Sequence, residues 1–216
     1  MIPDVSINGL SMFELGWLRE NVEFPTPKAV SEYVVVPGRN TPIRYTNAFG
    51  KISYEPRSFT ITLSMLGTRS EYDEKVSQVV NKIVGRLCQV ICSESPELYV
   101  VGTIQAEPSY DALSGRGTLV LTSEDGDSYR YHTTESQVAF SGSGIVLLPN
   151  DFMPVVPKIV TTDETTLAWK VGSDSFQKTL SAGEWEIPEL ELKQGDNTVN
   201  VTTEGPVTFR YREGRL

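Results

Sequence analysis

His132 is the only histidine of this 216-residue chain, so any mechanism that needs an imidazole base depends on it. A serine nucleophile activated by histidine often sits on a Gly-x-Ser-x-Gly turn, as in the α/β-hydrolases. No serine of this chain stands in that motif, and His132 lies in the polar sequence Tyr-His-Thr-Thr. We therefore expect an exposed loop histidine and no catalytic residue.

Carboxylates are the second kind of side chain that could do chemistry here, because glycoside hydrolysis requires a pair of them. Four glutamates lie between residues 184 and 191 and alternate with apolar residues. Such alternation is typical of a strand with one solvated face and one core face. The pattern favours a solvated strand face over a catalytic pair for Glu184, Glu186, Glu189 and Glu191.

Aromatic residues in the last third of the chain could stack on sugar rings and form a glycan-binding platform. The candidates are Trp169, Trp185 and Tyr211. Each lies in a predicted strand at a position that alternates with polar residues, which favours packing in a core. We keep the sugar platform as the second interpretation.

Motifs for metals and nucleotides are missing. Cys88, Cys92 and one histidine cannot complete a four-ligand zinc site of cysteines and histidines. The closest approach to a phosphate-binding glycine loop is Ser141-Gly142-Ser143-Gly144, and no helical pattern follows it. We predict no cofactor, no metal, and two reduced thiols rather than a disulfide.

The charge balance argues against a protein that grips nucleic acid. The formal net charge is -9, whereas phosphate binding requires clustered lysines and arginines. No charged-then-apolar leader opens the chain, and its apolar runs fall far short of the roughly 20 residues that span a bilayer. We expect a soluble protein without membrane insertion.

Most of the elements that would position these residues are strands. Residues 59–65 and 117–122 alternate between apolar and polar side chains, as half-buried strands do. One helix is predicted over residues 70–87, with Ser70 and Asp73 resembling a capping box. At the C-terminus, residues 198–202 and 207–212 predict a hairpin with turns at Gly195 and Gly205-Pro206, and it buries Val199 and Phe209 on one face.

The spacing of strands and turn residues divides the chain. We predict a β-rich N-terminal domain over residues 1–140 with its helix packed on a sheet, and a Ser-, Gly- and Pro-rich linker over 141–157. Residues 158–216 contain short strands separated by turn signals, which indicates a small β-sandwich. The fold class expected is mainly β with one long helix.

The ordered set of segments resembles the distal tail proteins of long-tailed, non-contractile bacteriophages, and it covers nearly the whole chain. The order and spacing of the pieces carry the resemblance, since each piece alone is weak. They are Val36-Pro37-Gly38-Arg39-Asn40 with Ile43, the strand 54–61, the following helix, the hairpin 98–104, and residues 192–199 and 207–214. This chain has Thr41-Pro42 where the family pattern usually has a glycine.

The resemblance implies a structural protein and not an enzyme. In such a protein the N-terminal domain forms a homohexameric ring at the end of the tail tube, and a galectin-like sandwich lies outside it. The ring would join the tube to the hub or tail-associated lysin and carry receptor-binding proteins. The location implied is the virion tail tip, with assembly in the host cytoplasm. Candidate ring-loop residues are Gly38, Arg39, Asn40 and Arg57.

Two physical expectations accompany this interpretation. Strands 59–65 and 117–122 could leave sheet edges that pair across subunits of the ring. Acidic residues on the ring wall would let DNA pass without binding. The alternatives are a carbohydrate-binding module and a tail-tube subunit, which would form tubes rather than single rings.

Overall fold

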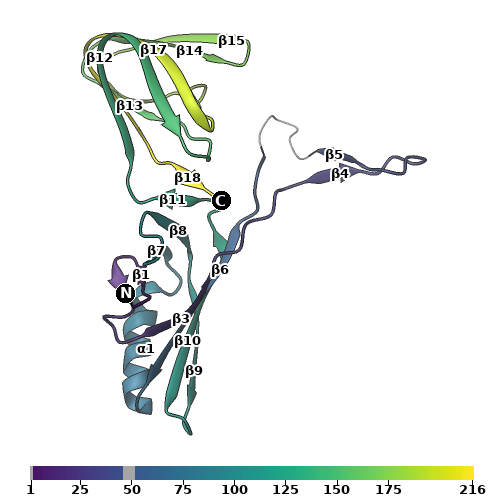
Figure 1. Ribbon diagram of the computed structural model, residues 1–216, viewed down its shortest axis with the longest axis vertical. Coiled ribbons are helices and arrows are strands. Elements are labelled where there is room, and N and C mark those ends of the chain that lie inside the picture. The colour runs from purple at the N-terminus through teal and green to yellow at the C-terminus, as the bar shows by residue number, and fades with distance from the viewer. Residues whose placement is uncertain (1, 46–51) are drawn as a thin grey trace. The chain divides into compact units, whose positions relative to one another are not determined.

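The computed structural model describes residues 2–45 and 52–216, and the fold is mainly β with one helix, as the sequence predicts (Figure 1). The chain divides into an N-terminal unit that ends at Arg130 and a C-terminal unit over Tyr131–Leu216. Each unit has its own cluster of buried apolar side chains. Among the described residues, no helix has the length and apolar character needed to cross a bilayer.

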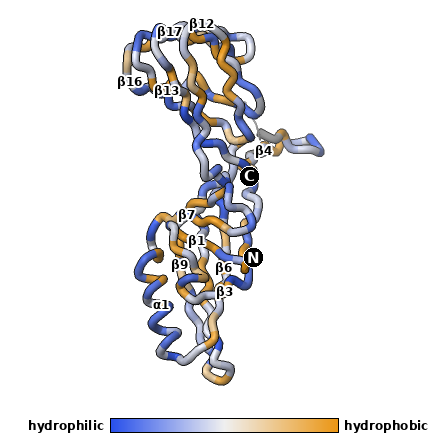
Figure 2. The backbone as a smooth tube through the Cα atoms, turned by 60° about the vertical axis from the view of Figure 1, so that its left-hand side comes forward, coloured by the Kyte–Doolittle hydropathy of each residue, from blue (hydrophilic) through white to orange (hydrophobic). Residues whose placement is uncertain are grey.

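The core of the N-terminal unit lies between short sheets and one helix. One sheet contains, in this order, β8 (Leu98–Thr103), β7 (Leu87–Cys92), β1 (Val5–Ile7) and β2 (Leu10–Ser11). The other has the order β3 (Leu18–Glu23), β6 (Arg57–Leu66), β10 (Arg116–Gly126) and β9 (Gln105–Asp111). Figure 2 shows β1 and β7 as largely hydrophobic and the helix as largely hydrophilic.

The alternation predicted for residues 59–65 is confirmed. Phe59, Ile61, Leu63 and Met65 are all buried on one face of β6. The expectation that this strand and residues 117–122 form free edges is wrong, because β6 and β10 pair with each other and lie inside the sheet. The edges are β3 and β9. A bulge at residue 20 interrupts β3, and Pro108 lies within β9. Both features disfavour the addition of another strand.

The helix α1 (Arg69–Ile83) is shorter than predicted, and its cap is different. Thr68 is the N-cap: its hydroxyl accepts from the Glu71 N–H, while the Glu71 carboxylate accepts from the Thr68 N–H at 2.8 Å. Gly85 has a φ of +69°, which suits glycine at the end of a helix. Leu87 therefore falls in β7, where it is 69% exposed, instead of on the helix stripe.

A two-stranded hairpin that we call the arm consists of β4 (Glu32–Val34), β5 (Ile43–Tyr45) and the residues between them. Figure 1 draws it as a separate two-stranded ribbon. The flanking segments continue the pairing, since the Val30 N–H donates to the Ser53 carbonyl at 2.8 Å. All residues from 33 to 42 are exposed.

The C-terminal unit is built around two long strands that the sequence did not reveal. They are β12 (Ser136–Asn150) and β17 (Gly195–Tyr211), which pair antiparallel along their whole length. The linker expected at 141–157 is wrong because residues 141–150 belong to β12. The hairpin expected at Gly205-Pro206 is also wrong, since both residues lie inside β17. Small polar residues and prolines mark a bulge here instead of a loop.

Because of this bulge, β17 pairs with different strands on its two sides. Ser141 pairs with Pro206 and Gly142 with Thr203, so two residues of β17 have no partner in β12. Before the bulge, β17 pairs with β14 (Thr165–Val171), which pairs in turn with β15 (Asp174–Leu180). After it, β17 pairs with β13 (Lys158–Thr161), which pairs with β16 (Gly183–Glu186). A Cβ on Gly205 would lie 1.8 Å from Asp163 Oδ2 and 2.5 Å from Thr162 Oγ1, so a larger residue here would have to displace both side chains.

The alternation in β17 is confirmed even though the hairpin is not. Val199, Val201, Val207, Phe209 and Tyr211 are all buried in the C-terminal core. Residues 189–192, predicted as a strand, form an irregular segment in which only Leu192 makes a bridge, to Val155. Both cysteines are free and buried, as expected.

Candidate functional site

His132 is not the exposed loop residue that the sequence suggested. It lies at the end of β11 (Arg130–His132), and its N–H donates to the Glu213 carbonyl. Its Nε2 is 3.0 Å from Asp151 Oδ2, and Arg215 contacts the same carboxylate at 3.0 Å. The hydrogen bond to His132, with Arg215 nearby, holds the pKa of Asp151 below its ordinary value. This arrangement ties the chain end to β11.

Metal ligands do not gather in the described part of the chain, where no group of three or more His, Cys, Asp or Glu side chains is placed to hold an ion. Burial raises the pKa of both cysteine thiols, which keeps them protonated and poorly nucleophilic. The four glutamates between 184 and 191 are exposed or partly exposed. One of them, Glu184, is paired with Lys158 at 2.6 Å.

The three aromatic candidates do not form one platform. Trp169 is 6% exposed; it stacks on Phe176 with ring centroids 5.6 Å apart and donates to the Glu189 carbonyl. Tyr211 is 3% exposed and donates to the Pro149 carbonyl at 2.5 Å. Trp185 alone is accessible, at 37%, on the edge strand β16. Trp169 and Tyr211 are core residues.

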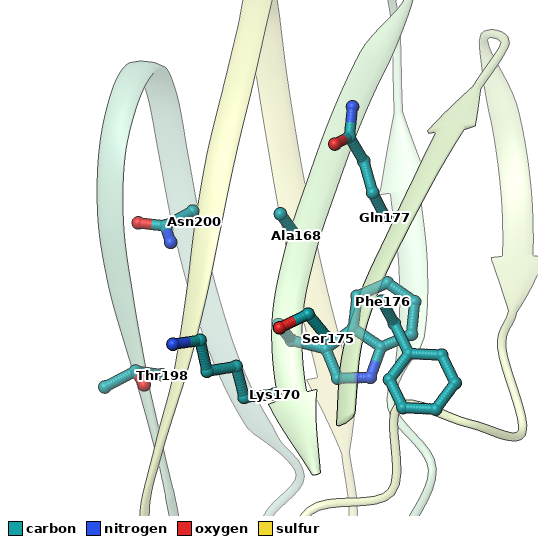
Figure 3. A pocket seen from close by; sticks show the side chains of 8 residues that line it. Ala168, Lys170, Ser175, Phe176, Gln177, Thr198 and Asn200 are labelled. Atoms are coloured by element: carbon teal, nitrogen blue, oxygen red, sulfur yellow. The ribbon is translucent and has the colours of Figure 1, made fainter. Parts of the chain in front are cut away.

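A hollow of about 480 Å³ lies over β14 and its neighbours β15 and β17, and Trp169 and Phe176 are among the residues that line it. Figure 3 shows Ala168 between Asn200 and Gln177, with Lys170, Ser175 and Thr198 in the next row. Ala168 is the smallest side chain of this group, so it forms the floor. The sequence contained a signal for this face. In each of these strands the residues that alternate with the buried ones point outward.

The ring-loop candidates separate into two places. Gly38, Arg39 and Asn40 lie in the exposed turn of the arm, where Gly38 has a φ of +80° and the Arg39 N–H donates to the Val36 carbonyl. Arg57 is instead 2% exposed inside the N-terminal unit.

Arg57 is held by backbone carbonyls. Its guanidinium donates to Pro25 at 2.8 Å, to Ser128 at 2.9 Å and to Phe24 at 3.3 Å. Burial, followed by repulsion from Arg130, lowers the pKa of Arg57. The contacts assign it a structural role that joins three segments of the unit.

The arm is the second surface that stands out. It exposes four consecutive apolar residues: Tyr33, Val34, Val35 and Val36 are 67%, 50%, 68% and 36% exposed. Isolated apolar residues on a surface are ordinary, whereas a contiguous exposed run marks an interaction site. The sequence showed this run of valines but gave no sign that they would lie outside a core.

Fold and surfaces together describe a two-unit β protein without an evident reactive centre in the part of the chain that the structure describes. The chain is similar in structure to the Dit protein of SPP1, which is described as a paradigm of the hub adsorption apparatus of phages that infect Gram-positive bacteria. The TM-score is 0.73 at 14% identity, and the match covers 100% of both chains. No family model and no curated protein matches the sequence. The fold of this chain is therefore that of a Dit protein.

Proposed function

We propose that this chain is a structural protein of a phage tail tip that forms a homohexameric ring. The ring connects the tail tube to the hub or tail-associated lysin and to receptor-binding proteins. The observation that carries the proposal is the Dit fold over the full length of both chains, including both units. Its place is the virion tail, after assembly in the cytoplasm of the bacterial host.

The arm supports self-association. Its exposed apolar run costs free energy in water, and a neighbouring copy would cover it. A ring needs one surface to meet a different surface on the next copy, with a rotation that closes. A hairpin that leaves its own fold and inserts against the neighbour meets this requirement. The edge strands β3 and β9 are less suited to this contact, because a bulge interrupts β3 and Pro108 lies within β9.

The charge of the chain supports the passage of DNA without binding. A net charge of -9 per copy becomes strongly negative in a ring of six, and like charge keeps DNA mobile. We propose that DNA crosses the ring and is not a bound partner.

Light scattering and electron microscopy of the purified full-length chain test the ring. We expect a mass of six copies and ring-shaped particles. Val35→Asp should convert the rings to monomers, since a carboxylate would be desolvated in the covered arm. The matched control is Ile145→Asp, the same kind of change at a 69% exposed position of the C-terminal unit, which should leave the rings intact.

Two results would contradict this proposal. A protein that stays monomeric at high concentration would contradict ring formation. Rings that still form with Val35→Asp would show that the arm is not part of the interface. Long tubes in the micrographs would favour the tail-tube alternative.

A further inference from the structure

The outward face of four strands in the C-terminal unit carries rows of side chains that are mostly polar and that include two apolar members, Ile145 and Ala168. The register places Ile145, Asn200, Ala168 and Gln177 in one row across β12, β17, β14 and β15. Two residues further along each strand, the next row contains Ser143, Thr202, Thr166 and Thr179. Because alternate residues share a face, both rows point away from the core.

Each row borders a hollow, and the two hollows follow one another along the strands. The first is the 480 Å³ hollow over Ala168. The second, of about 600 Å³, is lined by Ser143, Thr166 and Thr202 together with Asp163, Glu164 and Glu204. From Thr198 to Thr202 the face extends about 13 Å, at a rise of roughly 3.3 Å per residue. This length suits a short chain of linked units better than one small molecule.

Polar groups in the first hollow are available to a ligand. In the described part of the chain, the side chains of Asn200, Gln177, Ser175, Thr198 and Lys170 make no hydrogen bond or ion pair with protein. Elsewhere on the same face, by contrast, the hydroxyls of Thr166 and Thr179 are 2.9 Å apart. Two amides, two hydroxyls and an ammonium supply both donors and acceptors around an alanine floor.

We propose that this face binds a neutral saccharide chain. Sugar hydroxyls are both donors and acceptors, which matches the amides and hydroxyls of the first hollow. The exposed Ile145 and Leu147 on β12 offer apolar contact for the C–H surfaces of the sugar rings. Of the aromatic platform that the sequence suggested, Trp169 borders this site, whereas Trp185 and Tyr211 are not among its lining residues.

The charges on the face select against other occupants. Asp163, Glu164 and Glu204 at the second hollow repel a polyanion, so nucleic acids and anionic polysaccharides are disfavoured. A protein partner would favour an interface with an apolar or aromatic centre, whereas this centre is an alanine surrounded by amides. The proposal does not depend on ring formation.

A glycan array with the full-length protein is the first test, followed by calorimetry with the strongest ligand. The array should contain neutral oligosaccharides of glucose, galactose and N-acetylglucosamine, with heparin as an anionic probe. We expect binding to at least one neutral oligosaccharide and none to heparin. Asn200→Ala and Gln177→Ala should each weaken binding about tenfold, the effect of losing one good hydrogen bond.

Ala168→Leu is a second kind of variant, because it fills the floor without removing a polar group, and it should abolish binding. Gln137→Ala is the matched control: it removes an exposed amide from β12 outside both hollows and should bind like the original protein. Circular dichroism and light scattering of each variant test whether it remains folded and assembled.

Three results would overturn the saccharide site: no binding to any neutral glycan at millimolar concentration, preferential binding of heparin, or unchanged affinity in folded Ala168→Leu. Because ring assembly is measured on the same samples, a loss of sugar binding with intact rings would leave the tail-tip proposal standing.

Discussion

The two units complete their cores in different ways. The N-terminal unit encloses a cation, Arg57, whose hydrogen-bond partners in the described structure are backbone carbonyls. The C-terminal unit encloses hydroxyls instead: Thr165 donates to Thr203 at 2.8 Å and lies 2.6 Å from Thr161. Buried polar groups are tolerated in both because they are hydrogen-bonded.

The exposed surfaces of the two units also differ, and here it is the N-terminal unit that is more apolar. The N-terminal unit exposes an apolar arm, while the C-terminal unit exposes amides and hydroxyls on one sheet face, next to Ile145 and Leu147. Apolar surface is suited to association with another protein copy, and an array of neutral polar groups is suited to a polyhydroxyl ligand. If both proposals hold, assembly and recognition are divided between the units.

Trp169→Ala should have the largest effect, lowering the free energy of unfolding of the C-terminal unit by about 3–5 kcal/mol, since a large buried side chain is lost. Trp185→Ala should cost about 1 kcal/mol or less, because Trp185 is 37% exposed. Chemical denaturation followed by fluorescence measures both. Similar losses for the two tryptophans would mean that Trp185 is also a core residue.

Arg57→Met should destabilise the N-terminal unit by about 2–4 kcal/mol, because three carbonyls lose their donor inside the protein. Arg116→Met is the control, since this arginine is 51% exposed and pairs with Glu20 at the surface, where an ion pair contributes about 1 kcal/mol at most. Urea titrations of both variants test the difference. An Arg57→Met protein as stable as the original would show that the carbonyls find other donors.

Alkaline pH should weaken the C-terminal unit through Tyr211. Burial, with the nearby Glu213 carboxylate, raises the pKa of Tyr211 to about 12 from the ordinary 10. The unfolded state then loses its proton first, so stability that is complete below pH 10 declines as the pH rises to about 12. The expected decline from this residue is about 2–3 kcal/mol. Tyr211→Phe should reduce the slope of unfolding free energy against pH in that range, and an unchanged slope would contradict it.

The helix cap gives the smallest effect. Thr68→Ala should cost about 1 kcal/mol, because it removes the hydroxyl that accepts from Glu71 N–H. Ser70→Ala should be almost neutral, since Ser70 lies inside the helix and is not its cap. Thermal unfolding of both variants measures the difference. A larger loss of stability in Ser70→Ala than in Thr68→Ala would show that Ser70 is the cap, as the sequence suggested.

Local patterns predicted much of this fold. The alternation in residues 59–65 and 199–211 identified the buried faces correctly, because side-chain direction in a strand depends only on residue parity. The helix was found from its apolar spacing, although its cap and end were misplaced by a few residues. The resemblance carried by segment order agrees with the Dit fold.

Pairing between distant segments was beyond the sequence. Residues 141–144 look like a linker, yet β17 supplies their hydrogen bonds from more than fifty residues away and holds them as strand. The sequence also did not predict that Arg57 is buried or that the arm is exposed. A charged residue beside a strand gives no local sign that three carbonyls surround it, and a run of valines gives none that it lies outside every core.

The amino-acid order by itself determined the β-rich class, the single helix and the inward face of each main strand, because these follow from near-neighbour periodicity. Only the tertiary structure decided which strands are edges, which aromatic residues are accessible and where a hollow opens. Those features depend on contacts between segments far apart in the chain, and register across a sheet is set by the whole fold.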